Sequence, residues 1–221
     1  MSDGKKIIQI QKNIYDDNDK LAAEIKTELA SKRISLINIL GTPGCGKTTF
    51  LIGISKYLKD KKILVIEGDL ESDIDTVKLN SLGIDSFQIN THGGCHLDAV
   101  MVEKALNSIT DKDYDIIFIE NVGNLICTNE YDLGETKRIL LTTVTEGSDK
   151  PYKYPYIFEK ADAVIINKID LIPYVQFDED FFTKGIRHVN KTSPIFKLSS
   201  LRDEGTAAFV DWLKESLDKS N

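Results

Sequence analysis

Residues 41–48 read GTPGCGKT, which has the spacing G-x-x-x-x-G-K-T of a phosphate-binding loop. The loop directly follows the apolar stretch 34–40 (ISLINIL) and directly precedes a segment of helical character, as this motif requires. Gly41, Gly44 and Gly46 let backbone N–H groups converge on phosphate oxygens, and the helix N-terminus adds the positive end of its dipole. The alternative, a glycine-rich turn with a surface lysine, leaves the flanking strand and helix unexplained. The sequence therefore predicts that a nucleotide binds here.

The other residues of the loop divide between charge, metal binding and packing. Lys47 supplies a positive charge to the β- and γ-phosphates, and the Thr48 hydroxyl is a ligand for Mg²⁺. Thr49 follows in the same turn and joins the predicted nucleotide-binding residues. Cys45 belongs to the nucleotide-binding loop as a small space-filling residue and not as a metal ligand.

Residues 167–170 read NKID and follow the apolar stretch 163–166, so they fit the motif N-K-x-D that selects guanine. The Asp170 carboxylate accepts hydrogen bonds from N1–H and the exocyclic amine of guanine, whereas adenine offers neither donor there. Because an unpaired carboxylate is costly, ATP is expected to be rejected by roughly 1–3 kcal/mol. The alternative is an ordinary turn after a strand. The predicted guanine-binding residues are Asn167, Lys168, Asp170, Ser199 and Ser200, the two serines through their backbone.

Acidic residues follow two further strand-like stretches. Glu120 ends the stretch DIIFIE, where a carboxylate beside Mg²⁺ and the γ-phosphate is expected, and Gly123 follows where backbone must approach phosphate. Asp69 and Asp75 lie in GDLESDID and are expected to reach the same ion or to position the attacking water. For these two aspartates the alternative is a helix N-terminus enriched in acids. The predicted catalytic residues are Lys47, Asp75 and Glu120, and the predicted Mg²⁺ ligands, direct or through water, are Thr48, Asp75 and Glu120.

Short apolar runs alternate with helical segments along the chain, which predicts an α/β fold. Runs such as 116–119 and 164–166 are apolar at successive positions, as in strands covered on both faces of a mostly parallel sheet. We therefore expect a three-layer P-loop NTPase domain over 34–221, with helices on both faces of the sheet. Residues 15–33 place Leu21, Ile25 and Leu29 on one helical face, so residues 1–33 are expected to form a helical extension that packs on this domain.

The 221-residue composition excludes several classes of protein. No stretch approaches the roughly 20 apolar residues that cross a bilayer, and the start lacks the apolar run of a secretory signal, so we expect a cytoplasmic protein without a membrane partner. The net charge of −7 argues against a nucleic-acid partner, because such proteins usually carry a basic excess. Three cysteines are too few and too scattered for a disulfide framework.

Thiol and imidazole groups indicate a second site. Cys95 and His96 are adjacent, and Cys127 follows seven residues after Glu120. These soft ligands suit Zn²⁺ or Ni²⁺, and two neighbours with one distant thiol do not complete a four-coordinate site. A two-fold dimer would complete it by bringing each patch against its own copy. The alternative, three ordinary polar or buried residues, is left open by spacing alone.

The chain resembles the HypB family of GTPases, which help to insert nickel during maturation of [NiFe] hydrogenases. The resemblance covers residues from about 34 to 213. It rests on an ordered series of stretches in this sequence: GTPGCGKT, VIEGDLESDID, CHLDAVMVEKAL, FIENVGNL followed by cysteine, YDLGE, TVTEG, DKPYKYP and NKIDLIPYV.

The resemblance implies a SIMIBI-class G domain that hydrolyses GTP and forms a homodimer when GTP is bound. It implies a Ni²⁺ or Zn²⁺ site at the dimer interface, made by Cys95, His96 and Cys127, and a position for Lys153 near the nucleotide or the partner subunit. Its expected partners are another nickel accessory protein and the precursor of the hydrogenase large subunit. The chain carries neither the N-terminal cysteine motif nor the histidine-rich stretch of many relatives, and His92 replaces a common glycine as a candidate extra ligand.

Three functions are compatible with these residues. The first is a GTP-hydrolysing metallochaperone that hands nickel to a hydrogenase. The second is a regulatory GTPase switch in which a structural zinc joins the dimer, and dependence of metal affinity on the nucleotide separates it from the first. The third is a urease-type nickel GTPase, against which the ENVGNL and CHLDA stretches argue.

Overall fold

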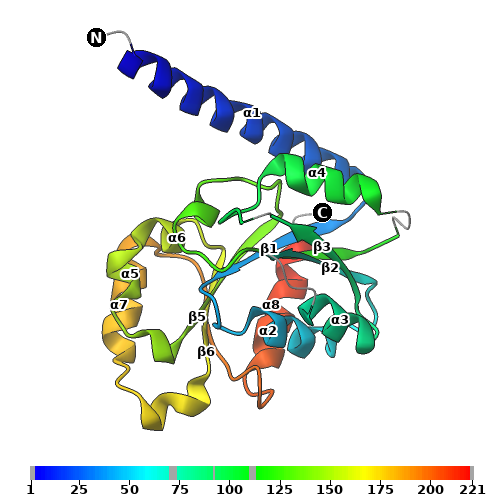
Figure 1. Ribbon diagram of the computed structural model, residues 1–221. Coiled ribbons are helices and arrows are strands. Elements are labelled where there is room, and N and C mark those ends of the chain that lie inside the picture. Colours follow the sequence, from blue (N-terminus) through cyan, green and yellow to red (C-terminus); the bar gives the residue numbers. More distant parts are fainter. Residues whose placement is uncertain (1–2, 70–73, 92, 110–112, 220–221) are drawn as a thin grey trace.

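The computed structural model describes residues 3–69, 74–91, 93–109 and 113–219 (Figure 1). The side chains of residues 3–14 and 69 lie outside this description.

A seven-stranded sheet forms the centre of the described structure, in the order β3-β2-β4-β1-β5-β6-β7. Each pair of neighbouring strands is parallel. The strands are β1 (Ser35–Gly41), β2 (Ile63–Asp69), β3 (Asp85–Asn90), β4 (Ile116–Glu120), β5 (Lys137–Thr143), β6 (Ala163–Asn167) and β7 (Ile195–Lys197). The prediction of a mostly parallel sheet is confirmed. Because the strands share one direction, the phosphate loop after β1, Glu120 on β4 and Asn167 on β6 meet at one edge.

Helices connect the strands. The helices are α1 (Asp3–Ser31), α2 (Lys47–Ser55), α3 (Ile74–Ser81), α4 (Ala99–Ser108), α5 (Lys150–Lys153), α6 (Pro155–Glu159), α7 (Glu179–Val189) and α8 (Thr206–Asp218). Short 3₁₀ helices are η1 (Cys127–Asn129), η2 (Val144–Glu146) and η3 (Ile169–Tyr174).

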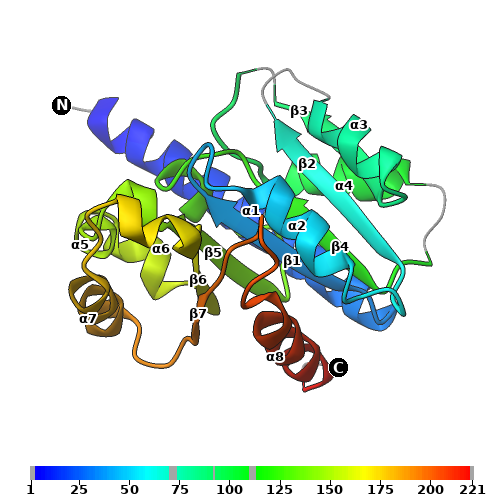
Figure 2. The ribbon, with the colours of Figure 1, turned by 90° about the horizontal axis from the view of Figure 1, so that it is seen from below.

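Alternating side chains of the strands give the sheet two apolar faces, as the unbroken apolar runs predicted. In β1, Ile37 and Ile39 pack into one cluster with Phe50 of α2 and Phe209 of α8. Figure 2 shows these two helices side by side in front of the sheet. On the opposite face, Leu36 packs with side chains of α1 and α4. Further along that face, side chains of α6 and α7 cover β5 and β6. The result is the three-layer arrangement expected from the sequence.

Helix α1 begins before the predicted segment 15–33 and covers α4 with its C-terminal half, while its N-terminal half projects beyond the sheet (Figure 1). Ala22, Ile25 and Leu29 are buried against the domain. Asn18 is also buried, and its Oδ1 accepts a hydrogen bond of 2.9 Å from the backbone N–H of Ala99, the first residue of α4. These contacts tie the helix to the element that follows Cys95 and His96.

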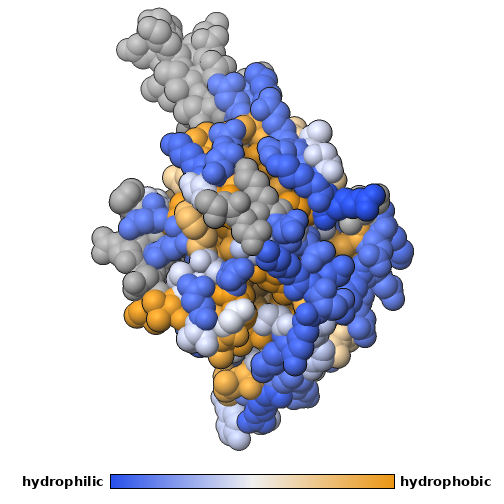
Figure 3. Space-filling view, turned by 90° about the vertical axis from the view of Figure 1, so that its right-hand side faces the viewer, coloured by the Kyte–Doolittle hydropathy of each residue, from blue (hydrophilic) through white to orange (hydrophobic). Residues whose placement is uncertain are grey.

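Figure 3 shows the face that lies at the right of Figure 1. Hydrophilic residues and smaller apolar patches are mixed on this face. Helix α3 lies on this side and exposes Ile74 and Val77. In the described part of the chain, no helix combines the length and apolarity needed to span a membrane.

Candidate nucleotide and metal sites

The phosphate loop runs from Gly41 at the end of β1 to Lys47 at the start of α2. Gly44 and Gly46 adopt positive φ values of 72° and 98°, which side chains disfavour. A Cβ atom on Gly46 would also lie 2.9 Å from Asn167 Nδ2. Gly46 is the N-cap of α2 and provides no side-chain hydrogen bond to the first turn, so those N–H groups are left for an anionic ligand.

A cavity of about 520 Å³ opens beside this loop at the carboxyl edge of the sheet. Several predicted residues line it together: Gly44, Gly46, Lys47, Thr48, Thr49, Asp75, Glu120, Gly123 and Lys168. Lys47 is 7% exposed, and its Nζ lies 3.5 Å from the carbonyl oxygen of Thr42. The fold thus gathers a buried positive charge, a helix N-terminus and acidic groups around one cavity.

Glu120 and Thr48 form the acidic end of the cavity. Thr48 Oγ1 donates a hydrogen bond of 3.0 Å to Glu120 Oε1, whereas Glu120 Oε2 is buried and has no hydrogen-bond partner among the described residues. Burial raises the pKa of Glu120 to about 7, against the opposing effect of Lys47. A buried oxygen without a donor, next to a hydroxyl, fits a divalent cation bound by Thr48 and Glu120. Asp75 lies close enough to raise the pKa of Glu120 further.

Glu67 is a cavity residue that the sequence analysis did not assign. It lines the cavity at 3% exposure, accepts a hydrogen bond from Thr76 Oγ1 and raises the pKa of Glu120. An acidic residue within an otherwise apolar buried strand was the available signal, because a buried carboxylate needs a partner. Asp69, two residues later, ends β2, and its side chain lies outside the described residues.

The guanine motif is joined to the phosphate loop by direct hydrogen bonds. Asn167 Nδ2 donates to the Cys45 carbonyl at 3.0 Å, and Lys168 Nζ donates to the Gly44 carbonyl at 2.6 Å. Lys168 adopts a left-handed conformation with φ 59°, which turns the chain sharply after β6. Asn167 Oδ1 in turn accepts hydrogen bonds from the N–H and hydroxyl of Ser200. The structure therefore brings together three segments that the sequence assigned to one nucleotide.

Asp170 is held by two side chains of the loop after β7. Ser199 Oγ donates to Asp170 Oδ1 at 2.6 Å, and Arg202 Nε lies 3.6 Å from Oδ2. The Ser199 N–H donates to the Glu204 carbonyl, so it stabilises the loop itself. The backbone contacts of Ser199 and Ser200 with guanine therefore stay predictions.

Close packing explains why small residues occur in the phosphate loop and at Gly123 beside it. A Cβ on Gly123 would lie 2.8 Å from the backbone nitrogen of Pro43, so only glycine fits this approach. A Cβ on Gly41 would lie 2.6 Å from Cys45 Sγ. Cys45 is 1% exposed, and burial raises the pKa of its thiol to about 11, which fits the predicted packing role.

Thr42 of the phosphate loop forms a hydrogen bond with Glu146, which was not among the predicted site residues. Its Oγ1 donates a hydrogen bond to Glu146 at the end of η2, and Lys150 Nζ lies 3.9 Å from Glu146 Oε2. The stretch TVTEG contains this acid, but its contact with the phosphate loop depends on the adjacency of β1 and β5.

The predicted metal ligands lie near one another in pairs within the chain. Cys95 Sγ lies 3.6 Å from His96 Nδ1, and the nearby Cys95 thiol is the main cause that raises the pKa of Cys127. Zn–S and Zn–N bonds of about 2.3 and 2.1 Å at a tetrahedral angle would separate sulfur and nitrogen by about 3.6 Å, so this pair fits one ion. Among the residues that the structure describes, no group of three potential ligands is close enough to hold a metal.

Comparison with known proteins shows the family to which the chain belongs. A family model described as the CobW/HypB/UreG nucleotide-binding domain matches residues 35–197. The hydrogenase maturation factor HypB of Rhizobium leguminosarum bv. viciae is 40% identical over 213 residues, which cover 96% of this chain and 71% of that protein. The chain belongs to the HypB family. The hydrogenase/urease maturation factor HypB of Helicobacter pylori strain J99 is 38% identical over 215 residues, or 96% and 88% of the two chains.

A solved HypB structure has the same fold. The crystal structure of HypB from Helicobacter pylori in complex with nickel has a TM-score of 0.88 and 37% sequence identity, and the match covers 92% of this chain and 96% of that one. The P-loop NTPase fold predicted from the sequence is confirmed.

Two further site residues were predicted from the resemblance to the HypB family, Lys153 and His92. Lys153 pairs with Asp149 at 2.5 Å and lines a separate cleft of about 580 Å³ with Ile126 and Tyr156. Its contact with a nucleotide or a partner subunit stays a prediction. His92 lies outside the described residues.

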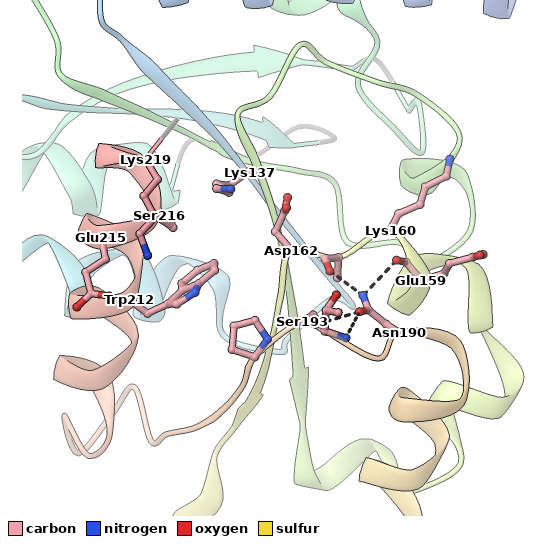
Figure 4. A pocket seen from close by; sticks show the side chains of 13 residues that line it. Lys137, Glu159, Lys160, Asp162, Asn190, Ser193, Trp212, Glu215, Ser216 and Lys219 are labelled. Atoms are coloured by element: carbon pink, nitrogen blue, oxygen red, sulfur yellow. Dashed lines mark hydrogen bonds between the residues drawn. The ribbon is translucent and has the colours of Figure 1, made fainter. Parts of the chain in front are cut away.

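A polar cleft of about 500 Å³ lies at the amino edge of the sheet in this HypB-family chain (Figure 4). It separates Trp212 of α8 and Lys219, which directly follows that helix, from Lys160 and Asp162 after α6. Asn190 lines it, but its amide is engaged with main-chain groups. No predicted site residue is among the described residues that line this cleft.

Proposed function

We propose that the chain is a GTP-hydrolysing metallochaperone of nickel-enzyme maturation. The observation that carries this proposal is the joint architecture at the carboxyl edge: a phosphate loop hydrogen-bonded to a guanine motif, with Cys127 seven residues after the cavity acid Glu120. Membership of the HypB family supports the same activity.

The nucleotide cavity supports hydrolysis through positioning and electrostatics. The N–H groups at the start of α2 and the Lys47 ammonium would bind the phosphates, and Asp170 would select guanine. Thr48 and Glu120 would hold Mg²⁺, with Asp75 as a ligand through water or as the group that positions the attacking water. Mg²⁺, when bound, would neutralise charge on the phosphate oxygens. The motifs contain no evident arginine finger, so we expect slow intrinsic hydrolysis.

The metal site would be completed by dimerisation. Cys95, His96 and Cys127 would provide ligands for Ni²⁺ or Zn²⁺ from each of two GTP-bound subunits. Hydrolysis would relax the dimer and allow nickel to move to an acceptor. The expected partners are another nickel accessory protein and the hydrogenase large-subunit precursor. Because HypB of Helicobacter pylori is called a hydrogenase/urease maturation factor, a urease acceptor is the related alternative.

The domain division and the location also stay proposals. Residues 1–33 would form a helical extension of a G domain over 34–221, supported by the burial of Ile25 and Leu29. A cytoplasmic location rests on the sequence composition.

One observation favours a second function. The 3.6 Å separation of Cys95 Sγ and His96 Nδ1 fits tetrahedral coordination, which zinc prefers. In that alternative a structural Zn²⁺ joins the subunits of a regulatory GTPase switch and stays bound through hydrolysis.

One experiment tests these functions together. Ni²⁺ and Zn²⁺ stoichiometry and affinity would be measured with oligomeric mass, in GDP and in a non-hydrolysable GTP analogue, for wild type and Cys95→Ala. The metallochaperone requires a nucleotide-dependent nickel affinity and loss of metal in Cys95→Ala. An affinity that is the same in both nucleotides supports the switch instead. Equal turnover of ATP and GTP by wild type would refute the guanine-specific account.

A further inference from the structure

We propose that Tyr131 is a positioning residue that holds the His96 imidazole in its metal-binding orientation. This inference rests on the proposed metal site and adds a residue outside the ligand set. Its basis is a ring stack: the two ring centroids lie 4.0 Å apart, and the ring planes differ by 7°.

The position of Tyr131 in the chain gives this stack its significance. Cys127 begins η1, the Glu130 N–H donates to the Cys127 carbonyl at 3.2 Å, and Tyr131 follows directly. His96 belongs to a different segment, between β3 and α4. The segment that carries one proposed ligand therefore also contacts the ring of another. This contact sets the imidazole plane relative to Cys127.

The main chain of Tyr131 is tied to the buried core. Arg138 Nη2 lies 3.5 Å from the Tyr131 carbonyl oxygen, and Arg138 Nε donates to Glu135 Oε1 at 2.7 Å. Glu135 also accepts hydrogen bonds from the Leu133 N–H at 2.8 Å and from Asn38 Nδ2 at 3.3 Å in β1. This network restrains the backbone from which the Tyr131 ring projects.

Helix α1 contacts the same ring. The Tyr15 and Tyr131 ring centroids lie 5.4 Å apart at an angle of 43°, and the Tyr15 hydroxyl donates to Glu130 Oε2 at 2.8 Å. Tyr131 is half-buried. Its ring contacts Tyr15 of α1 and also stacks on His96 of the proposed metal site. The helix thus supports a metal ligand that lies far from it in sequence.

The physical effect is restriction of one torsion. A His ring rotates readily about its last bond, since this torsion has a broad energy profile. Stacking against Tyr131 limits that rotation and keeps Nδ1 at 3.6 Å from Cys95 Sγ. A metal ion then binds a preset pair of ligands and does not have to order the ring. Residues that orient metal-bound histidines change metal affinity by about 10- to 100-fold when they are replaced.

The test compares two substitutions of one ring. Tyr131→Leu keeps apolar packing against α1 but removes the stacking plane, whereas Tyr131→Phe keeps the plane and removes only the hydroxyl. Ni²⁺ affinity would be measured by competition with a chromophoric chelator, in GDP and in a non-hydrolysable GTP analogue. We expect Tyr131→Leu to bind Ni²⁺ about 10-fold more weakly and Tyr131→Phe to stay within about twofold of wild type.

A second comparison separates positioning from general packing. In a His96→Ala background, Tyr131→Leu should cause no further loss of Ni²⁺ affinity, because its effect passes through the imidazole. An equal loss in both backgrounds would show that the ring only supports the fold. Wild-type affinity in a folded Tyr131→Leu variant would also overturn the inference, with folding checked by the urea midpoint.

The same experiment distinguishes this inference from the proposed function. If His96→Ala alone left Ni²⁺ affinity unchanged, the proposed ligand set itself would be wrong. If His96→Ala lost metal and Tyr131→Leu retained it, only the role of Tyr131 would be refuted.

Discussion

Asn167 Nδ2 donates a hydrogen bond of 3.0 Å to the carbonyl oxygen of Cys45, and this bond joins the guanine motif to the phosphate loop. Both residues are buried, and Asn167 Oδ1 also accepts from the Ser200 N–H at 3.0 Å. One amide therefore hydrogen-bonds to both the phosphate loop and the loop after β7. The segments that would contact the base and the phosphates are therefore coupled through a single side chain.

Asn167→Ala should weaken GDP and GTP binding to a similar extent. It leaves the buried Cys45 carbonyl without its donor, at a cost of about 1–3 kcal/mol, and a loss of this size in binding corresponds to roughly 5- to 150-fold in affinity. Calorimetric titration with each nucleotide would measure this loss. Asn107→Ala, at an exposed position on α4, is the matched control and should bind as wild type. Unchanged affinity in Asn167→Ala would contradict this role.

Asp170→Asn should change the base that the site prefers. An amide can donate to the C2 carbonyl of xanthine but cannot accept both guanine donors, so GTP affinity should fall by about 10-fold or more and xanthosine triphosphate affinity should rise. The contact with Ser199 can persist, because the amide keeps an acceptor oxygen. Competition between the two nucleotides would measure the shift. The same preference for GTP in the variant would place guanine recognition elsewhere.

Glu120→Gln should remove a pH dependence of stability in protein free of nucleotide and metal. The folded-state pKa of about 7 lies above the ordinary value of 4.5, so the folded chain holds this proton more tightly than the unfolded chain. The resulting stability is complete below pH 4.5 and is lost as pH rises through 7. The loss is on the order of 3 kcal/mol.

Urea unfolding at pH 5 to 8 checks this prediction. Glu120→Gln should have the flatter profile and be more stable than wild type above pH 7. The control Glu24→Gln, at an exposed position of α1, should keep the wild-type slope. Parallel profiles for wild type and Glu120→Gln would show that Glu120 titrates normally in the folded chain.

Gly134→Ala should loosen helix α1. Gly134 has φ 79°, and its added Cβ would lie 2.5 Å from the Ala22 carbonyl oxygen and 3.0 Å from Ile25. We expect a loss of about 2–4 kcal/mol, since a clash adds to backbone strain. Gly83→Ala isolates the strain, because Gly83 has φ 76° and open space around its Cβ position. Equal urea midpoints of the two variants would mean that α1 does not pack closely at Gly134.

Residue types at short spacing allowed much of the molecule to be predicted. Unbroken apolar runs such as 116–119 and 163–166 predicted central strands of the sheet, because parallel strands there are covered on both faces. The apolar spacing predicted a helix over 15–33 within a helical extension over 1–33, and α1 runs from Asp3 to Ser31. Glu67, Glu146 and Tyr131 were not assigned, because each acts on a residue far away in the sequence.

The sequence by itself predicted the phosphate loop, the guanine motif and the acid Glu120, since each is a local pattern with its own chemistry. Only the tertiary structure decided that Asn167 reaches Cys45, that Cys127 approaches Cys95 and that Tyr131 stacks on His96. Strand order decides such contacts: β4 lies between β2 and β1, and β5 separates β1 from β6. The order depends on packing of the whole chain, so no local spacing encodes it.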